Sequence, residues 1–576
     1  MDGGVLQQRE LEAIQRIVKE NKRRNRRVYL REQADRRRQE LAAENNVTAT
    51  PSTAAAAEVE AVSTADDQVT MLTNDETFTT LLPEQDEMMT AEERIETPVS
   101  PYTTRLLVHS DSNFRFSHHR EAELLMHYLD HVFAIQFRFH VPSVSSGGRG
   151  WLLYLLTETK PLYSAVLSLG ALHQHTLLRH SLRAVQYHDT WNELNAHHNR
   201  ALQELQVFLQ SSYGTNTEGA TRKRKLQILA CGVAFISFEV SLDVERECAH
   251  CLNVPMQLFK GGTSDWDLHL NALTEVLLGN AYESHDVNQT PQSLVSSPTH
   301  ISRVQSLEDT AESFLTGAII WFESLSCAST GRAPRLLEKY QILLEQGDID
   351  LANIAGFQSW TAIIIGEIAA LGVWKREAEA THTLSFWQLF ERGDSIRRRL
   401  SGHIDVLRAE LANIIPTADG PQVDFATAYL VMADPALHAQ AVRRAVTLVF
   451  AQAALVYLHT TISGANPALA EIVLSVSATA NALQELRAIA DPQHLRSLVW
   501  PICIAGSMAT EQTLQAFFRG LIEGLGEEAL IFGNSGSVLR IMEKCWAYRR
   551  GGISEGERYC DWAKAMDLTG QRILLV

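Results

Sequence analysis

Residues that could bind a metal ion occur in two places in the sequence. Cys248-Ala-His-Cys251 has the cysteine spacing of a zinc knuckle, and His127 and His131 would lie on one face of a helix. A structural zinc site usually needs four ligands, and the next cysteine after Cys251 is Cys327. The pattern therefore favours core-edge or surface positions for the histidines, with metal binding as the alternative.

The catalytic motifs that mark the common enzyme classes do not occur in the sequence. It contains no Gly-Lys pair, and hence no phosphate-binding P-loop, and no His-Glu-x-x-His. The glycine clusters at 147–150 and 524–526 do not follow an apolar strand, so they do not indicate a dinucleotide site. We therefore predict that the protein is not an enzyme. The alternative is a helical enzyme or a small-molecule or metal-binding protein that uses the histidines and a core pocket.

A basic segment lies near the N-terminus. Residues 9–41 contain no Pro or Gly and predict one helix, which is the first of three predicted regions, at 1–41. Such a cluster attracts phosphate without selecting bases, so it indicates nuclear import or contact with the DNA backbone. A solvated charged helix is the alternative. The candidate residues are Lys22, Arg23, Arg24, Arg26, Arg27, Arg36, Arg37 and Arg38.

An acidic segment follows, at 42–104, and its composition predicts disorder. From Thr48 to Pro101 there are 12 acidic residues and a single basic one, Arg94. Apolar residues alternate with the acids, which is typical of a transcriptional activation segment whose anchors fold onto a partner. The candidate anchors are Phe78, Leu81 and Leu82. An inert acidic linker is an equally good interpretation.

The third region, 105–576, has a helical pattern nearly throughout. Asp434-Pro435 predicts a helix start and Gly464 its end, whereas Pro501 should kink or break a helix that begins at Asp491-Pro492. Polar residues predict loops at 211–225 and at about 281–305. Strand alternation is not sustained anywhere. The tryptophans are expected to be core residues.

Composition bounds the class of protein. The 576 residues are 45% hydrophobic with a net charge of −17, which argues against a protein that binds nucleic acid along its whole surface. The charge is uneven: residues 1–40 carry 12 Lys/Arg against 7 Asp/Glu. The apolar stretches 226–242 and 445–462 contain polar residues and are shorter than a membrane span, so they predict buried helices. Seven cysteines and a charged N-terminus predict an intracellular chain without a disulfide framework.

Several strings, in order, resemble the fungal-specific transcription factor domain, the regulatory part of fungal zinc binuclear cluster proteins. The resemblance starts at 124–163 and continues through Trp266-Asp-Leu-His-Leu270 and Trp321-Phe322. It ends with Arg496-Ser-Leu-Val-Trp-Pro501 and Glu543-Lys-Cys-Trp546. It implies an all-α fold and a pathway-specific regulator, for example of a biosynthetic gene cluster, and it carries over no catalytic residues.

The sequence departs from this family at its start. Family members begin with six cysteines that bind two zinc ions and place a helix in the major groove, whereas here no cysteine precedes Cys231. The expected cofactor list for this chain is therefore empty. Either an upstream exon is missing, or the protein acts through a DNA-bound partner.

The sequence thus predicts an all-α nuclear regulator of transcription: a basic helix, a disordered acidic segment and a large multi-helix regulatory domain. The resemblance implies the transcription machinery or a DNA-bound partner as its contacts, with DNA binding that is indirect or truncated. It further implies a homo- or heterodimer, activation of genes and no membrane association.

Overall fold

The structure is a computed structural model that describes residues 116–142, 147–178, 184–210, 218–251, 265–279, 306–345, 349–412, 434–551 and 559–576. The predicted basic helix at 9–41, the acidic segment at 42–104 and the predicted loop at about 281–305 lie outside these ranges. The predictions made for those segments therefore remain predictions.

The described residues are all-helical, without a strand, as the sequence predicts. The first elements are α2 (Phe116–His127), a π-helical turn η1 (Tyr128–Val132), α3 (Phe133–Gln136), α4 (Gly150–Glu158), α5 (Lys160–Leu178), α6 (Ala184–Gln210), α7 (Glu218–Cys251), α8 (Asp265–Gly279), α9 (Leu307–Thr330) and α10 (Leu337–Glu345). The later elements are η3 (Leu351–Asn353), α11 (Ser359–Ala380), α12 (Phe386–Ala412), α14 (Pro435–Ser463), α15 (Ala470–Ile489), η4 (Pro492–Leu498), α16 (Val499–Met508), α17 (Gln512–Glu523), α18 (Glu527–Ile531), α19 (Ser535–Arg550) and α20 (Trp562–Thr569).

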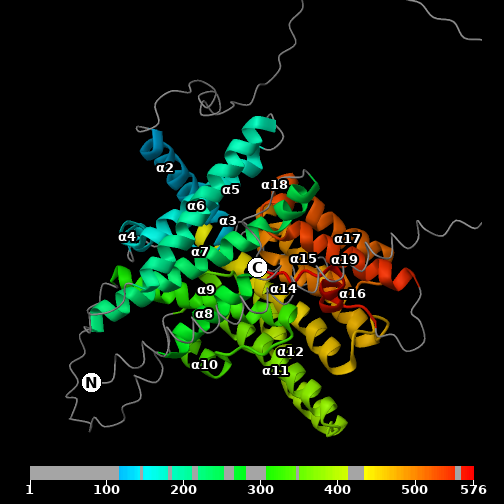
Figure 1. Ribbon diagram of the computed structural model, residues 1–576. Helices are drawn as coiled ribbons and strands as arrows, with labels where there is room; N and C mark the ends of the chain where they lie inside the picture. Colours follow the sequence, from blue (N-terminus) through cyan, green and yellow to red (C-terminus); the bar gives the residue numbers. More distant parts are fainter. Residues whose placement is uncertain are drawn as a thin grey trace, which may run out of the picture. The chain divides into compact units, whose positions relative to one another are not determined.

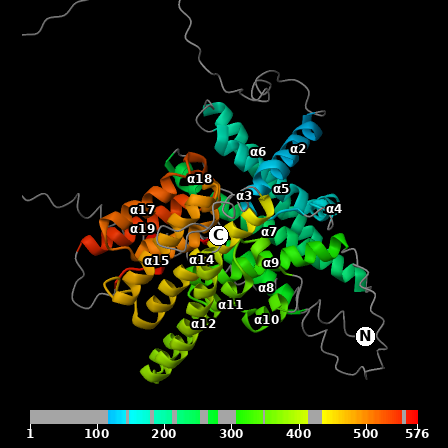
Figure 2. The same cartoon turned by 180° about the vertical axis from the view of Figure 1, so that it is seen from behind.

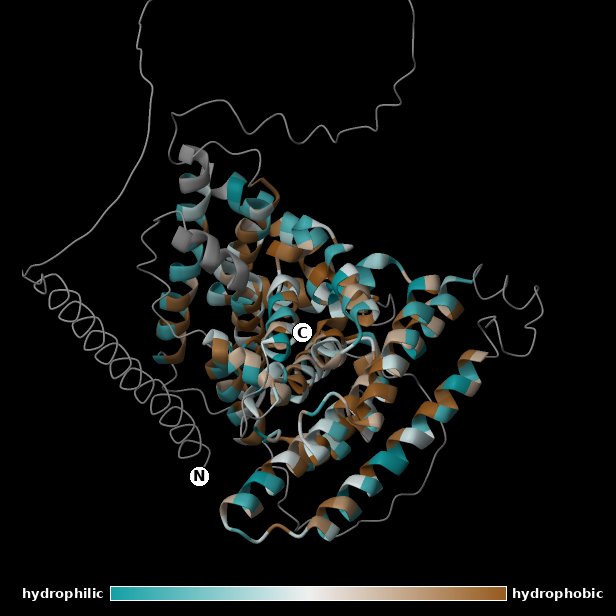
Figure 3. Ribbon diagram, turned by 90° about the vertical axis from the view of Figure 1, so that its right-hand side faces the viewer, coloured by the Kyte–Doolittle hydropathy of each residue, from teal (hydrophilic) through white to brown (hydrophobic). Residues whose placement is uncertain are grey.

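The helices pack around a few that are buried along most of their length. Every residue of α16 is buried, as are most residues of α9 and the central part of α14. In Figures 1 and 2, α5 and α6 pair on the N-terminal side, α15, α17 and α19 surround α16, and α11 and α12 lie together beside α14. Figure 3 shows hydrophobic residues concentrated between helices and hydrophilic residues on outward faces. Burial of these apolar stripes drives the assembly.

The ends of the main core helix lie where the sequence predicts them. The Asp434 carboxylate accepts hydrogen bonds from the backbone N–H groups of Ala436 and Leu437, and Pro435 occupies the first turn of α14. Gly464 ends the helix at a φ of 84°, which a side chain would strain. By length and composition α14 could cross a membrane, but 78% of its most apolar window is buried inside the protein. The other predicted core segment, 226–242, lies in α7, where residues up to Ser241 are mostly buried.

The predicted loop at 211–225 is wrong for its second half. Residues 218–225 form the first turns of α7 and carry the basic run Arg222, Lys223, Arg224 and Lys225. The like charges of such a run repel one another, so the sequence of the run alone predicts a loop. In the fold Arg222, Lys223 and Lys225 meet carboxylates from α4 and α9, which are at least 65 residues away in the sequence.

The break predicted at Pro501 is also in the wrong place. The chain changes from the 3₁₀ helix η4 to the α-helix α16 between Leu498 and Val499, and Pro501 is the third residue of α16. The first backbone N–H groups of an α-helix have no intrahelical acceptor. A proline in this first turn therefore costs no hydrogen bond and does not kink the helix.

Tryptophan side chains connect segments that are far apart in the sequence. The indole N–H of Trp266 (α8) donates to the Arg572 carbonyl at 2.9 Å, and that of Trp562 (α20) to the Ala328 carbonyl of α9 at 3.1 Å. Trp546 of α19 donates to the Gly506 carbonyl of α16 at 2.8 Å. All three rings are buried, as expected for core tryptophans. The C-terminal residues are thereby connected to the middle of the domain.

One close helix contact gives a stability prediction. A Cβ at Gly170 of α5 would lie 2.6 Å from the backbone oxygen of Leu124 in α2, so the two helices would have to separate. We expect Gly170→Ala to lower the free energy of unfolding by about 1–3 kcal/mol, the usual cost of overpacking. The measurement is urea denaturation of the full chain.

Gly402→Ala in α12 is the matched control. No atom lies within 4 Å of a Cβ at Gly402, so the same substitution should raise the free energy of unfolding by about 0.5–1 kcal/mol through helix propensity. Equal effects at the two positions would show that the contact between α2 and α5 is not tight.

Candidate functional site

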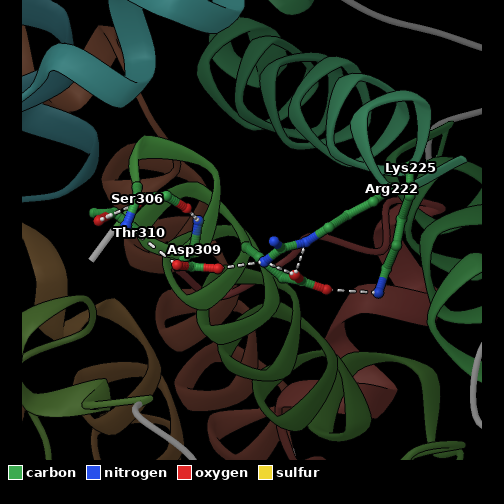
Figure 4. Close-up of polar contacts among 6 residues, drawn as sticks. Arg222, Lys225, Ser306, Asp309 and Thr310 are labelled. Carbon is green, nitrogen blue, oxygen red and sulfur yellow. Dashed lines mark hydrogen bonds and ion pairs between the residues drawn. The ribbon is translucent and has the colours of Figure 1, made fainter. Parts of the chain in front are cut away.

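The basic run at the start of α7 is the part of the described chain that most resembles a nucleic-acid contact, and its charges are already paired. The Arg222 Nη2 atom lies 2.7 Å from Asp309 Oδ1 and 2.7 Å from Glu312 Oε2, and Lys225 Nζ lies 2.9 Å from Glu312 Oε1 (Figure 4). Lys223 Nζ contacts the Glu158 carboxylate at 2.8 Å. This run therefore holds α7 against α4 and α9 instead of presenting a free phosphate-binding surface.

The helix cap of α9 fixes the carboxylate that Arg222 uses. Ser306 Oγ accepts a hydrogen bond from the Asp309 backbone N–H at 3.0 Å, and Asp309 Oδ2 accepts one from the Ser306 N–H at 3.1 Å, which is a capping box (Figure 4). Hydrogen bonds from Arg222 and then Ser306 lower the pKa of Asp309 to about 2. Asp309 therefore stays ionised, so one carboxylate both starts α9 and binds α7.

The histidines flagged by the sequence are brought together with a carboxylate. His127 Nε2 lies 2.9 Å from His173 Nδ1, and His173 Nε2 lies 3.2 Å from Glu528 Oε1. Because the carboxylate only accepts, His173 donates to it through Nε2–H. His131 is exposed, with its ring centroid 4.9 Å from that of His127.

Burial and a cation set the charges of this chain of side chains. Burial, followed by the nearby His173, lowers the pKa of His127 to about 4, so its imidazole is neutral at pH 7. Hydrogen bonds from His173 and then Arg496 lower the pKa of Glu528 to about 2. Arg496 Nη1 lies 2.9 Å from Glu528 Oε1. The cluster is thus an ion pair between Arg496 and Glu528, extended by two imidazoles.

Metal binding finds no support in the part of the chain that the structure describes. No three His, Cys, Asp or Glu side chains there gather as a metal site. Cys248 and Cys251 end α7, but their side chains lie outside the described set. The five described cysteines are free thiols buried in the core, and no set of residues in the chain has the six-cysteine spacing of the family's zinc cluster. The residues present therefore do not fit that cluster.

The structure also exposes an aromatic patch that sequence reasoning missed. Phe386, Trp387 and Phe390, in the first turns of α12, are 79%, 72% and 59% exposed. Exposed aromatic clusters are typical of protein–protein contacts. Three large aromatic residues within five positions, beside the exposed charges of the same helix, are the signal that could have indicated this patch. Of the predicted site residues, the basic positions between Lys22 and Arg38 and the anchors Phe78, Leu81 and Leu82 all lie outside the described residues.

The pKa of His127 gives a prediction for acid stability. A histidine whose pKa is 6.5 unfolded and about 4 folded takes up a proton on unfolding between these pH values, so stability falls as the pH drops from 6.5 to 4. Near pH 5, His127→Gln should reduce the proton uptake on unfolding by about one. The measurement is the slope of the unfolding free energy against pH. His131→Gln, an exposed imidazole on the same helical run, is the control, and an unchanged slope in His127→Gln would contradict the prediction.

The sequence is similar to a known protein family and to two regulators of transcription. Residues 123–576 match the family described as fungal specific transcription factor domain. The chain is 31% identical over 457 residues to the trichothecene biosynthesis transcription regulator TRI10 of Trichoderma arundinaceum, covering 75% of this chain and 92% of that one. It is 30% identical over 470 residues to TRI10 of Fusarium sporotrichioides, covering 79% and 98%.

A third relative is longer than this chain. The transcription factor ntnD of a Nectria species is 26% identical over 466 residues, covering 78% of this chain and 66% of its own. No solved structure matches the chain. The resemblance inferred from the ordered strings is confirmed, as is the prediction that the protein is not an enzyme. The chain belongs to the fungal-specific transcription factor domain family and is a regulator of transcription.

Proposed function

We propose that the protein is a pathway-specific regulator of a secondary-metabolite gene cluster. The observation that carries this proposal is the similarity to the two TRI10 regulators, since the alignment covers nearly the whole of both relatives. More distant relatives are also named as cluster regulators, including the ustiloxin B cluster transcription factor ustR of Aspergillus flavus at 26% identity. We infer an activator that works in the nucleus.

The distribution of charge supports a different role for each segment of the chain. In the described basic run, Arg222, Lys223 and Lys225 are paired with carboxylates, and Arg224 donates to the Phe208 carbonyl. We therefore assign import and contact with the DNA backbone to Lys22, Arg23, Arg24, Arg26, Arg27, Arg36, Arg37 and Arg38. We assign activation to the acidic segment, with Phe78, Leu81 and Leu82 as anchors for the transcription machinery. The helical domain would then contact a DNA-bound partner or a second subunit.

Base recognition has two explanations that make different predictions. If an upstream exon supplies a six-cysteine cluster, the mapped 5′ end of the transcript will encode it in frame with Met1. If a partner reads the bases, immunoprecipitation of the tagged chain will recover the partner together with cluster promoters. Each result excludes the other as the main route.

A deletion strain tests the proposed function. We expect deletion of the gene to lower the transcripts of one contiguous set of biosynthetic genes, and the full chain to restore them. A variant with Lys22, Arg23, Arg24, Arg26 and Arg27 changed to Ala should stay in the cytoplasm, because the cationic cluster for import is lost. Transcript profiling and fluorescence imaging are the measurements.

Two matched control variants, one for activation and one for import, separate these two roles. Phe78→Ala/Leu81→Ala/Leu82→Ala should enter the nucleus but fail to restore the transcripts, whereas Val59→Ala/Val62→Ala, in the same acidic segment, should restore them. For import, Arg397→Ala/Arg398→Ala on exposed parts of α12 is the control. An unchanged transcriptome in the deletion strain would disprove the proposed function.

A further inference from the structure

A small cavity lies where the N-terminal and C-terminal parts of the domain meet. Its volume is about 70 Å³, and its walls come from α3, α7, α9, η4 and the turn before α19. The first and last residues that form it, Ile135 and Val576, are about 440 positions apart in the sequence. The cavity therefore exists only when both ends of the domain are correctly packed together.

The wall of the cavity is mainly apolar. Phe137, Ile236, Trp321 and Phe532 line it and are buried. Gly533 has a φ of 107°, a conformation that side chains rarely adopt, and it lets the chain turn between Phe532 and α19. Val240 and Ser497 are partly exposed, so the cavity opens toward the surface on that side.

Three buried hydrogen-bonding atoms at this cavity have no partner in the protein. They are both side-chain amide atoms of Gln136 and the indole Nε1 of Trp321. Trp266, Trp546 and Trp562, by contrast, each donate to a backbone carbonyl. Buried polar atoms are nearly always paired, so a cluster of unpaired ones facing a cavity indicates a molecule that pairs them. Together they require a partner with acceptors and at least one donor.

The positive charge of Arg496 on the cavity wall is already compensated. Arg496 lines the cavity, but its guanidinium donates to Glu528 at 2.9 Å and to the Phe532 carbonyl at 3.0 Å. An anion entering the cavity would compete with the Glu528 carboxylate and would face the lone pairs of the Gln136 amide oxygen. The surroundings therefore favour a neutral molecule.

The volume limits the part of a ligand that can be enclosed. An engineered cavity of about 150 Å³ accepts benzene, so 70 Å³ encloses only a few non-hydrogen atoms. A larger molecule would place one end in the cavity and leave the remainder at the open side. That end must carry oxygen or amide groups to meet Gln136 and Trp321.

We propose that this cavity binds the oxygen- or amide-bearing end of a small neutral molecule through Gln136 and Trp321. The ligand connects α3 and α9 with the turn before α19, and so stabilises the packing of the two ends of the domain. Its role as an effector of transcription rests on the proposed function. Binding itself does not, because it is measured on the purified protein.

Acetamide and acetate are the probes, since they have the same shape and differ in charge and in hydrogen-bond donors. The full chain is labelled with ¹⁵N at its ten tryptophans, and Trp321→Phe identifies the Trp321 indole signal. Acetamide should shift this signal saturably, with a dissociation constant of about millimolar or weaker for so small a ligand. Acetate should not shift it at the same concentration.

Two controls make the test specific. Trp151 is also buried with an unpaired indole N–H, but it does not line the cavity, so its signal, identified with Trp151→Phe, should not move. Gln136→Met keeps the side-chain volume and removes the amide, so it should raise the melting temperature of the free protein and abolish the acetamide shift at Trp321. A Trp321 signal that ignores acetamide, or moves only in step with Trp151, would overturn the proposal. A larger shift with acetate would overturn the assignment to neutral ligands. Neither outcome affects the transcript result in the deletion strain.

Discussion

A buried indole N–H needs an acceptor, and three tryptophans meet this requirement across long sequence distances. The acceptor for Trp266 is 306 residues away, that for Trp562 is 234 residues away and that for Trp546 is 40 residues away. The two hydrogen bonds with the largest sequence separations connect residues near the C-terminus to α8 and α9. The cavity depends on the same arrangement, because its walls come from α3, α7 and α9 on one side and from η4 and the turn before α19 on the other. Trp321, one of the described indoles whose N–H has no partner in the protein, lies at this cavity.

Ion pairs neutralise the basic side chains that lie between helices at the start of α7 and in η4. Arg222, Lys223 and Lys225 bind carboxylates of α4 and α9, and Arg496 binds Glu528 of α18. Partly exposed pairs of this kind contribute little stability each, but they fix which helices meet. This pairing supports the proposal that the N-terminal basic cluster supplies the attraction to DNA and that the helical domain contacts protein and ligand.

Contacts between neighbouring residues can be predicted from the sequence, and they locate the helices well. Contacts between residues that are far apart in the sequence cannot be predicted in this way. Asp434 and Gly464 mark the ends of α14 correctly because a cap is a contact between neighbours. The helical start of α7 was missed because the partners of Arg222 are 87 and 90 residues away. The π-helical turn at Tyr128–Val132 has no signal in the apolar periodicity. Gln136 and Trp321 could not be paired from the sequence, although a glutamine between the apolar residues 132–135 and Phe137 is itself unusual.

The nature of the acceptors in the tryptophan bonds has an evolutionary consequence. Each acceptor is a backbone oxygen, of Arg572, Ala328 or Gly506, so the side chain at that position can change without loss of the bond. The donor cannot change, because no other side chain combines this ring area with an N–H at its edge. Relatives that share less than a third of their residues can therefore keep one architecture, provided that the donors are retained while the acceptor positions drift. Because these positions can vary, the sequence of a regulator and the molecules that it recognises can change while its fold is kept.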